Sequence, residues 1–293
     1  MAQDEFFSRL GGRFPPHGVP FLEPGPPPAP GQARRLALVL AYDGQAYAGW
    51  QVQPGAPTVQ GQVEAALRRL CGHPVRILAS GRTDAGVHAL GQVASFDTHS
   101  RLDLATMARG LGALLPSDIH LRALGAVAGD FHARYSALAK TYDYYLWPAC
   151  GASLFLRGRL WAHPRPLDLA AVRQALALLP GPQDLLALAS QGSEVQGTTV
   201  REILEANLET WPWGLWRVRV TATGFLRHVV RNLVGVLAQV GAGRLGPDDL
   251  SAMLASGQRR QAGPKAPPGG LYLSRVYYRP WPGDGQGPEI RKG

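Results

Sequence analysis

The chain has 293 residues, of which 45% are hydrophobic, and 30 Lys and Arg against 21 Asp and Glu give it a formal net charge of +9. This length predicts one large domain or two ordinary ones. The absence of a long apolar run or a secretory signal argues against a membrane protein, and two cysteines, Cys71 and Cys150, predict neither a disulfide framework nor a zinc cluster. The basic charge favours a polyanionic partner, although a GC-rich coding bias would also enrich Arg.

The first half of the chain predicts an alternation of strands and helices. Residues 1–33 are rich in Pro and Gly and predict a flexible extension outside the fold. Apolar periodicity then predicts, in order, strand 35–42, helix 59–70 with Thr58 as its N-cap, strands 75–79 and 92–96, helix 102–115 and strand 119–123. This order is that of a split βαβ unit.

The second half repeats the same order of elements. The patterns predict strand 142–146, helix 169–179, strands 203–208 and 215–222, helix 226–237 and strand 271–278. We therefore expect an α+β fold of two similar split βαβ halves, with mainly antiparallel sheets and helices on one face. The expected domains are 34–136 and 137–281, followed by a flexible tail, 282–293.

Residues 81–96 form the most informative segment. Arg82, Thr83 and Asp84 stand between Gly81 and Gly86, and segments typical of β-strands flank them. Because glycine permits sharp turns, we expect Asp84 at the tip of a tight connection, two residues from Arg82. An Asp beside Gly is also typical of an ordinary turn, so the segment alone leaves both interpretations open.

Segment 81–96 resembles the signature loop of the TruA-type tRNA pseudouridine synthases, and further blocks resemble the same family in the same order. These blocks are 42–44, 48–53, 57–61, 115–119, 131–137, 140–144, 225–235 and 266–273. The resemblance implies two sheets joined across a central RNA-binding cleft that holds the active site. It also implies a cytoplasmic homodimer acting on tRNA, with uridines 38, 39 and 40 of the anticodon stem-loop as targets.

Pseudouridine formation breaks the bond from ribose C1′ to uracil N1 and joins C1′ to C5, which requires neither a cofactor nor a metal. The resemblance implies that Asp84 is the catalytic carboxylate, as in glycosyl chemistry. The sequence leaves three routes open: the carboxylate adds to the sugar, adds to the base, or drives elimination to a glycal. The resemblance further implies that Arg231 pairs with this carboxylate and that Tyr142 stacks on the uracil and relays the C5 proton. Pattern alone favours a solvated helix face for Arg231 and a core aromatic for Tyr142.

The resemblance also implies a set of substrate contacts. Arg82 is expected to replace the uridine that flips out of the stem, and Leu273 to wall the base pocket. The RNA-contacting segment comprises Phe131, His132, Ala133, Arg134 and Tyr135, with Arg134 as a phosphate ligand. His88 is assigned a structural hydrogen bond. One departure is the pair Gln196-Gly197, where many relatives carry Lys or Arg, so one expected RNA contact is missing or supplied elsewhere.

Two other function classes suit parts of this sequence. A non-catalytic RNA-binding module would use two basic α+β halves, but it would not need Asp84, Tyr142 and Arg231 together. An aspartyl-nucleophile hydrolase would also use an exposed Asp, but such enzymes normally need a metal and further carboxylates. Around Asp84 the chain offers Arg, Thr and His instead.

Overall fold

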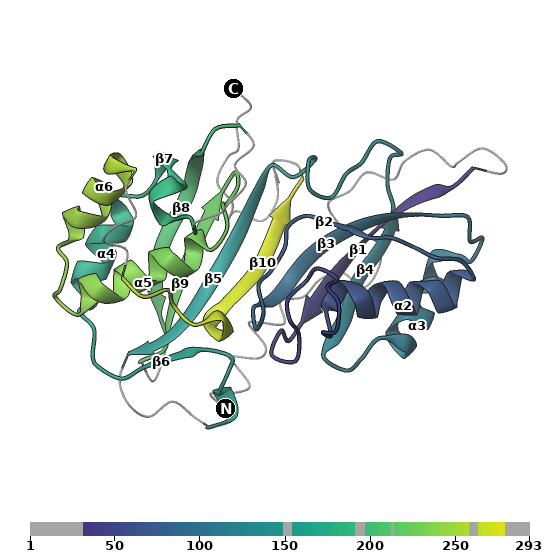
Figure 1. The fold of residues 1–293 in the computed structure, drawn as a ribbon, viewed down its shortest axis with the longest axis horizontal. Helices are drawn as coiled ribbons and strands as arrows, with labels where there is room; N and C mark the ends of the chain where they lie inside the picture. The colour runs from purple at the N-terminus through teal and green to yellow at the C-terminus, as the bar shows by residue number, and fades with distance from the viewer. Residues whose placement is uncertain (1–31, 149–153, 191–196, 212–213, 258–262, 279–293) are drawn as a thin grey trace. The chain divides into compact units, whose positions relative to one another are not determined.

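The computed structural model describes residues 32–148, 154–190, 197–211, 214–257 and 263–278 (Figure 1). They form two compact units: the first runs to Ala137 and resumes at Leu273, and the second runs from Leu138 to Tyr272. The expected tail and all but the last two residues of the expected extension lie outside the described residues. Among the helices of these ranges, none combines the length and apolar character needed to cross a membrane.

The first unit is a sheet with two helices. Its elements are β1 (Arg34–Tyr42), α2 (Val59–Cys71), β2 (Leu78–Ala79), β3 (His88–Thr98), α3 (Leu104–Leu114), β4 (Ile119–Ala126) and most of β10 (Leu271–Tyr277). Strand β1 lies between β4 and β3, antiparallel to both, and β2 pairs antiparallel with β3. Because β3 lies between β1 and β2, the unit has the expected split βαβ topology.

Helices α2 and α3 lie on the same face of this sheet (Figure 1). Helix α2 begins after Thr58, whose Oγ1 accepts a hydrogen bond of 3.3 Å from the Gly61 N–H, so the predicted N-cap is confirmed. It ends at Gly72, which adopts φ 75°, a left-handed conformation that suits glycine. The buried side chains of α2 and β1 belong to the core of the unit.

The second unit repeats this arrangement with additions. Its elements are β5 (Ala139–Pro148), the 3₁₀ turn Leu154–Leu156, β6 (Trp161–His163), α4 (Leu169–Ala177), β7 (Gly181–Asp184), the 3₁₀ turn Leu185–Leu188, β8 (Val200–Thr210), β9 (Trp216–Ala222), α5 (Val229–Gly241), α6 (Pro247–Ser256) and the 3₁₀ turn Pro268–Gly270. Strand β9 lies between β5 and β8, antiparallel to both, and β7 pairs with β8. The expected α+β class with mainly antiparallel sheets is therefore confirmed.

The two faces of the β5–β9–β8 sheet differ in chemistry. Tyr142, Tyr144 and Leu146 alternate with Thr141, Asp143 and Tyr145 along β5, so the two sets point to opposite faces. The Tyr144 side faces α5, a helix in which every residue except Gln239 is buried. On the other face, polar side chains pair across the strands, Thr141 with Thr221 and Asp143 with Arg219.

The structure differs from the sequence expectations in several elements. Strand β2 covers only Leu78–Ala79 of the expected 75–79, because only these residues pair with β3. Helix α5 starts at Val229 rather than residue 226, since His228 adopts φ 67° just before it. The expected second domain, 137–281, differs near its end: β10 neighbours β3 in the sheet order, and the described residues from Leu273 to Tyr278 belong to the first unit.

Candidate functional site

A loop of residues 80–87 joins β2 to β3 and carries Arg82 and Asp84. The fully buried Gln92, from β3, fixes its beginning. The Gln92 side-chain amide donates a hydrogen bond of 2.7 Å to the Gly81 carbonyl, and the Ser80 hydroxyl donates one of 2.7 Å to the Gln92 side-chain oxygen. Because buried polar groups are costly to leave unpaired, these bonds restrict the start of the loop to one backbone conformation.

Thr83 anchors the middle of the loop to the first strand and the segment after it. Its hydroxyl is 2.8 Å from the Tyr42 hydroxyl in a buried contact, and its carbonyl accepts a 3.0 Å hydrogen bond from the Trp50 N–H. Burial raises the pKa of Tyr42 far above its ordinary value, and hydrogen bonding to Thr83 opposes that rise only in part. The Tyr42 side chain is therefore a neutral hydroxyl at physiological pH, and its hydrogen bond holds Thr83 in place.

The close approach of the loop to residue 49 requires glycine there. Gly49 has φ 107°, and a Cβ atom at this position would lie 2.7 Å from the Thr83 carbonyl oxygen. On the far side of the loop, the Val87 N–H donates a 3.1 Å hydrogen bond to the Asp84 carbonyl, which closes a tight turn. The loop backbone is thus held on both sides, while the Arg82 side chain is exposed and Asp84 is half-buried.

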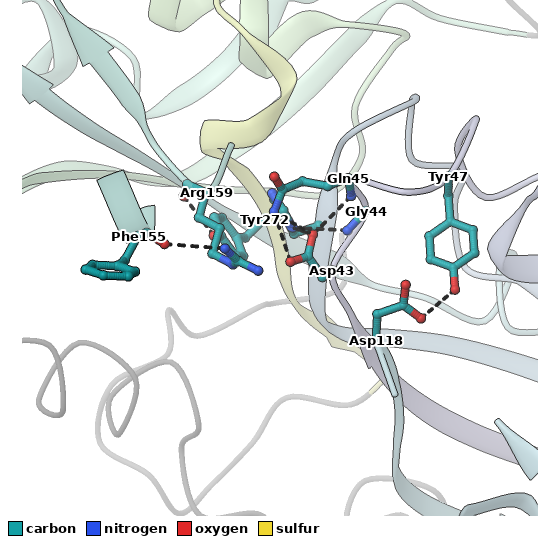
Figure 2. A network of polar contacts seen from close by, with 9 residues as sticks. Asp43, Gly44, Gln45, Tyr47, Asp118, Phe155, Arg159 and Tyr272 are labelled. Carbon is teal, nitrogen blue, oxygen red and sulfur yellow. Dashed lines mark hydrogen bonds and ion pairs between the residues drawn. The ribbon is translucent and has the colours of Figure 1, made fainter. Parts of the chain in front are cut away.

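His88 follows the loop at the start of β3 and is buried. Its Nδ1 accepts a 3.1 Å hydrogen bond from the Gly44 N–H and lies 3.3 Å from an Asp43 carboxylate oxygen. Because Nδ1 accepts from the Gly44 N–H, it does not donate a hydrogen bond to Asp43 in this arrangement. Figure 2 shows Asp43 bonded to Gln45, and Tyr47 directing its hydroxyl to Asp118. This geometry gives His88 a role in ordering the turn beside the loop.

Arg231 lies in the first part of α5 and is only 8% exposed. Its Nε donates a 2.8 Å hydrogen bond to the Ala266 carbonyl, and its own carbonyl accepts one of 3.1 Å from the Ala266 N–H. A Cβ at Gly235 would lie 2.3 Å from the Pro264 carbonyl oxygen, so segment 264–266 runs directly against the helix. The solvated helix face is therefore the wrong interpretation of Arg231, because a chain segment covers it.

Tyr142 and Tyr144 share one face of β5 but differ in environment. Tyr144 is completely buried, and its hydroxyl donates a 2.9 Å hydrogen bond to the Pro267 carbonyl. Tyr142 is half-buried, and its ring meets the Phe225 ring edge to face at a centroid distance of 5.1 Å. Tyr144 is thus the core aromatic of this strand, whereas Tyr142 retains an accessible ring that Phe225 orients.

The segment Phe131–Tyr135 divides into buried and exposed members. The Phe131 and Ala133 side chains are buried, so they pack within the unit and do not face solvent. Nδ1 of His132 accepts hydrogen bonds from the backbone N–H groups of Arg134, at 3.0 Å, and Tyr135, at 3.3 Å. Tyr135 is 74% exposed, its ring lies 4.4 Å from the His132 ring, and the Arg134 guanidinium lies 5.5 Å from its centroid. This is a preformed aromatic and cationic platform.

The remaining expected site positions differ in what the structure says of them. The Leu273 side chain is fully buried, which favours a packing role. Gln196 lies outside the described residues, whereas Gly197 is described, with φ 81°. Sequence reasoning missed the supports, Gln92 and Phe225. A Gln within the apolar strand β3 was the available signal for the first, because such a side chain needs buried partners.

Comparison with models of protein families shows to which family this chain belongs. The family model described as tRNA pseudouridine synthase matches residues 38–136 and 175–279. The chain belongs to the tRNA pseudouridine synthase family. Asp84, Arg82 and Arg231 lie within the matched ranges, whereas Tyr142 lies between them.

Curated relatives support the same family over most of the chain. A tRNA pseudouridine synthase A of Geobacillus kaustophilus is 43% identical over 246 residues, which cover 84% of this chain and 95% of the relative. That of Moorella thermoacetica is 44% identical over 83% of this chain and 99% of its own length. That of Syntrophotalea carbinolica is 43% identical over 84% and 96%. The family relationship thus covers both units of the structure.

Proposed function

We propose that this protein isomerises uridine to pseudouridine in tRNA, at positions 38, 39 and 40 of the anticodon stem-loop. The family match over both units carries the proposal. The reaction breaks the C1′–N1 bond and forms a C1′–C5 bond. The uracil C5 loses a proton and N1 gains one, so the reaction is redox-neutral and consumes no co-substrate.

In this proposal, Asp84 is the catalytic carboxylate. Its loop is held by Gln92 and Thr83, which fixes the backbone that carries the carboxylate. Preorganised charge is effective in catalysis because it needs no reorganisation as the transition state forms. We assign to Arg231 the charge that keeps the Asp84 carboxylate ionised, and to Tyr142 the stacking on uracil and the relay of the C5 proton. The Arg231 Nε bond to Ala266 fixes the direction of the guanidinium.

The exposed residues are assigned to the RNA. Arg82 extends from the loop and would fill the space of the flipped uridine, which a planar cation suits. Arg134 and Tyr135, ordered by His132, would contact a phosphate and a base. The buried Phe131 and Ala133 side chains pack within the unit and do not contact the RNA themselves. The buried Leu273 would form an inner wall of the base pocket. We further propose that the protein works as a cytoplasmic homodimer, as the family resemblance implies.

Position-resolved mapping of pseudouridine tests the proposal. Unmodified tRNA is incubated with the protein, and pseudouridine is located by its chemical adduct at each position. We expect new pseudouridine confined to positions 38, 39 and 40. Tight tRNA binding without any pseudouridine would instead support the non-catalytic RNA-binding module, and modification elsewhere would reject the assigned target.

A further inference from the structure

A second group of aromatic and basic side chains lies in the unit that carries Arg231, in a stretch that the family model does not match. We call it the Phe155 strip; it comprises Phe155, Arg157, Arg159, Trp161, His163 and Arg165. Phe155 is 76% exposed, the largest exposed fraction among the large hydrophobic side chains recorded as exposed in the described residues. Figure 2 shows its ring projecting away from its turn, with Arg159 beside it. Burial does not explain a Phe in this position.

The backbone of the Phe155 strip is held in place, whereas Phe155, Arg157 and Arg165 are exposed. Nη1 of Arg159 donates a 3.4 Å hydrogen bond to the Phe155 carbonyl, and the Arg159 carbonyl accepts one of 2.8 Å from the Tyr272 hydroxyl. Trp161–His163 forms β6, which pairs in parallel with β5. Because the backbone of the strip is already ordered, the strip loses less conformational entropy when it binds a ligand.

The charge of the Phe155 strip favours an anionic ligand. It contains three arginines, and between Asp143 and Asp168 the sequence has no Asp or Glu. Arg157 and Arg165 are exposed. The Trp161 and His163 rings meet edge to face at 5.0 Å, so the strip combines paired aromatic rings with positive charge. This combination is typical of surfaces that stack bases and neutralise phosphates of unpaired nucleotides.

Contacts within the unit connect the Phe155 strip to Arg231. A Cβ at Gly269 would lie 2.3 Å from the Gly158 carbonyl oxygen, so the turn Pro268–Gly270 runs directly against the strip. A few residues earlier in the same segment, Ala266 is hydrogen-bonded to Arg231. The strip therefore lies one chain segment away from a proposed catalytic residue.

We propose that the Phe155 strip binds unpaired tRNA nucleotides that flank the target uridine, with Phe155 stacking on a base and Arg157 and Arg165 contacting phosphates. This inference rests on the proposed function. It adds an RNA contact to those proposed for the Asp84 loop and for Arg134 and Tyr135. Such a contact would replace the one expected at Gln196-Gly197, where this chain has no basic residue.

Two variants with matched controls test this inference by tRNA binding across a salt series. Phe155→Ala should weaken binding about tenfold with an unchanged salt slope, because it removes a stacked base and no charge. Leu186→Ala truncates another exposed apolar side chain of the same unit and should have no effect. Arg157→Ala should lower the salt slope by about 0.7, the value for one phosphate of a single strand. Arg244→Ala removes an exposed charge elsewhere and should leave the slope unchanged.

The outcomes separate this inference from the proposed function. If the wild-type protein forms pseudouridine but Phe155→Ala binds tRNA as tightly as Leu186→Ala, the strip is not an RNA contact. If Phe155→Ala changes the sedimentation of the free protein from dimer to monomer, Phe155 is a contact between copies and the inference is overturned. A wild-type protein that forms no pseudouridine would overturn the proposed function, while the binding comparison would still decide whether the strip holds RNA.

Discussion

The buried side-chain amide of Gln92 hydrogen-bonds to the Gly81 carbonyl at 2.7 Å, at the point where the loop carrying Arg82 and Asp84 leaves the sheet. The same side chain accepts the Ser80 hydroxyl. One buried Gln thus fixes the start of the loop, and Thr83 fixes its middle. We regard this pair of anchors as the reason that an exposed connection can present a carboxylate in a defined position.

Gln92→Leu should lower both the stability and the turnover of the protein. The change leaves the Gly81 carbonyl without its buried donor, which costs about 1–3 kcal/mol in the free energy of unfolding. Turnover at saturating tRNA should fall more than tRNA affinity, because the loop no longer holds Asp84 in one place. Urea unfolding and single-turnover kinetics measure the two effects. Gln183→Leu, which removes a similar bond in the other unit, should leave turnover per folded molecule unchanged.

Arg82→Ala should reduce turnover unequally on different targets. If Arg82 replaces the flipped base, it offsets an unstacking cost of a few kcal/mol that is larger for a paired stem uridine than for one in the loop. We expect a larger loss at position 39 or 40 than at position 38, in single-turnover rates measured across a salt series. Equal losses that low salt restores would show that Arg82 makes only a phosphate contact.

The ion pair of Asp97 and Arg35 predicts a pH-dependent stability. Parallel hydrogen bonds of 2.8 and 2.7 Å from Arg35 hold the pKa of Asp97 below its usual range. A depressed carboxyl pKa stabilises the fold above the unfolded pKa of about 3.9 and ceases to do so as pH falls through the folded pKa. Asp97→Asn should therefore cost about 0.2–1 kcal/mol at pH 7, since the pair is partly exposed.

The measurement is the difference in unfolding free energy between wild type and Asp97→Asn at several pH values. The difference should be constant at neutral pH and shrink as the pH falls below about 4. A difference that persists undiminished at low pH would show that the Asn substitution acts through packing rather than through charge.

Arg219→Leu should destabilise the second unit strongly. Arg219 makes bonds of 2.7 and 2.9 Å to Asp143, whose side chain is only 3% exposed. Removing one partner of a buried pair costs about 3–5 kcal/mol, because a carboxylate stays behind in a poorly solvated place. Urea unfolding measures the loss. Arg217→Leu, on the same strand with a partly exposed partner, Glu209, should cost clearly less, and equal costs would contradict this account.

Sequence patterns predicted the elements that carry long apolar periodicity, and missed those that depend on partners. Strands β8 and β9 correspond to the predicted strands 203–208 and 215–222. Helix α6 was missed, although Pro247 at its first turn and Gly257 at its end are signals of its boundaries. Strand β6 is three residues long and pairs in parallel, so it has no local signature.

The same distinction applies to the candidate site. The glycines around Asp84 predicted a tight displayed turn, and Gly86 adopts φ 74° there. The burial of Arg231 could not be predicted, because segment 264–266, far along the chain, covers it. The positive φ of His228 was equally hidden, since a non-glycine residue adopts it only when its surroundings impose it.

The most direct test of the central claim is single-turnover pseudouridine formation by Asp84→Asn on unmodified tRNA, measured beside tRNA binding. The substitution keeps the shape of the side chain and removes its charge. We expect turnover to disappear while tRNA affinity stays within about tenfold, a difference of about 1.4 kcal/mol. Asp97→Asn, the same substitution in the same unit, should retain wild-type turnover. Clear pseudouridine formation by Asp84→Asn would contradict the assignment of Asp84 as the catalytic carboxylate.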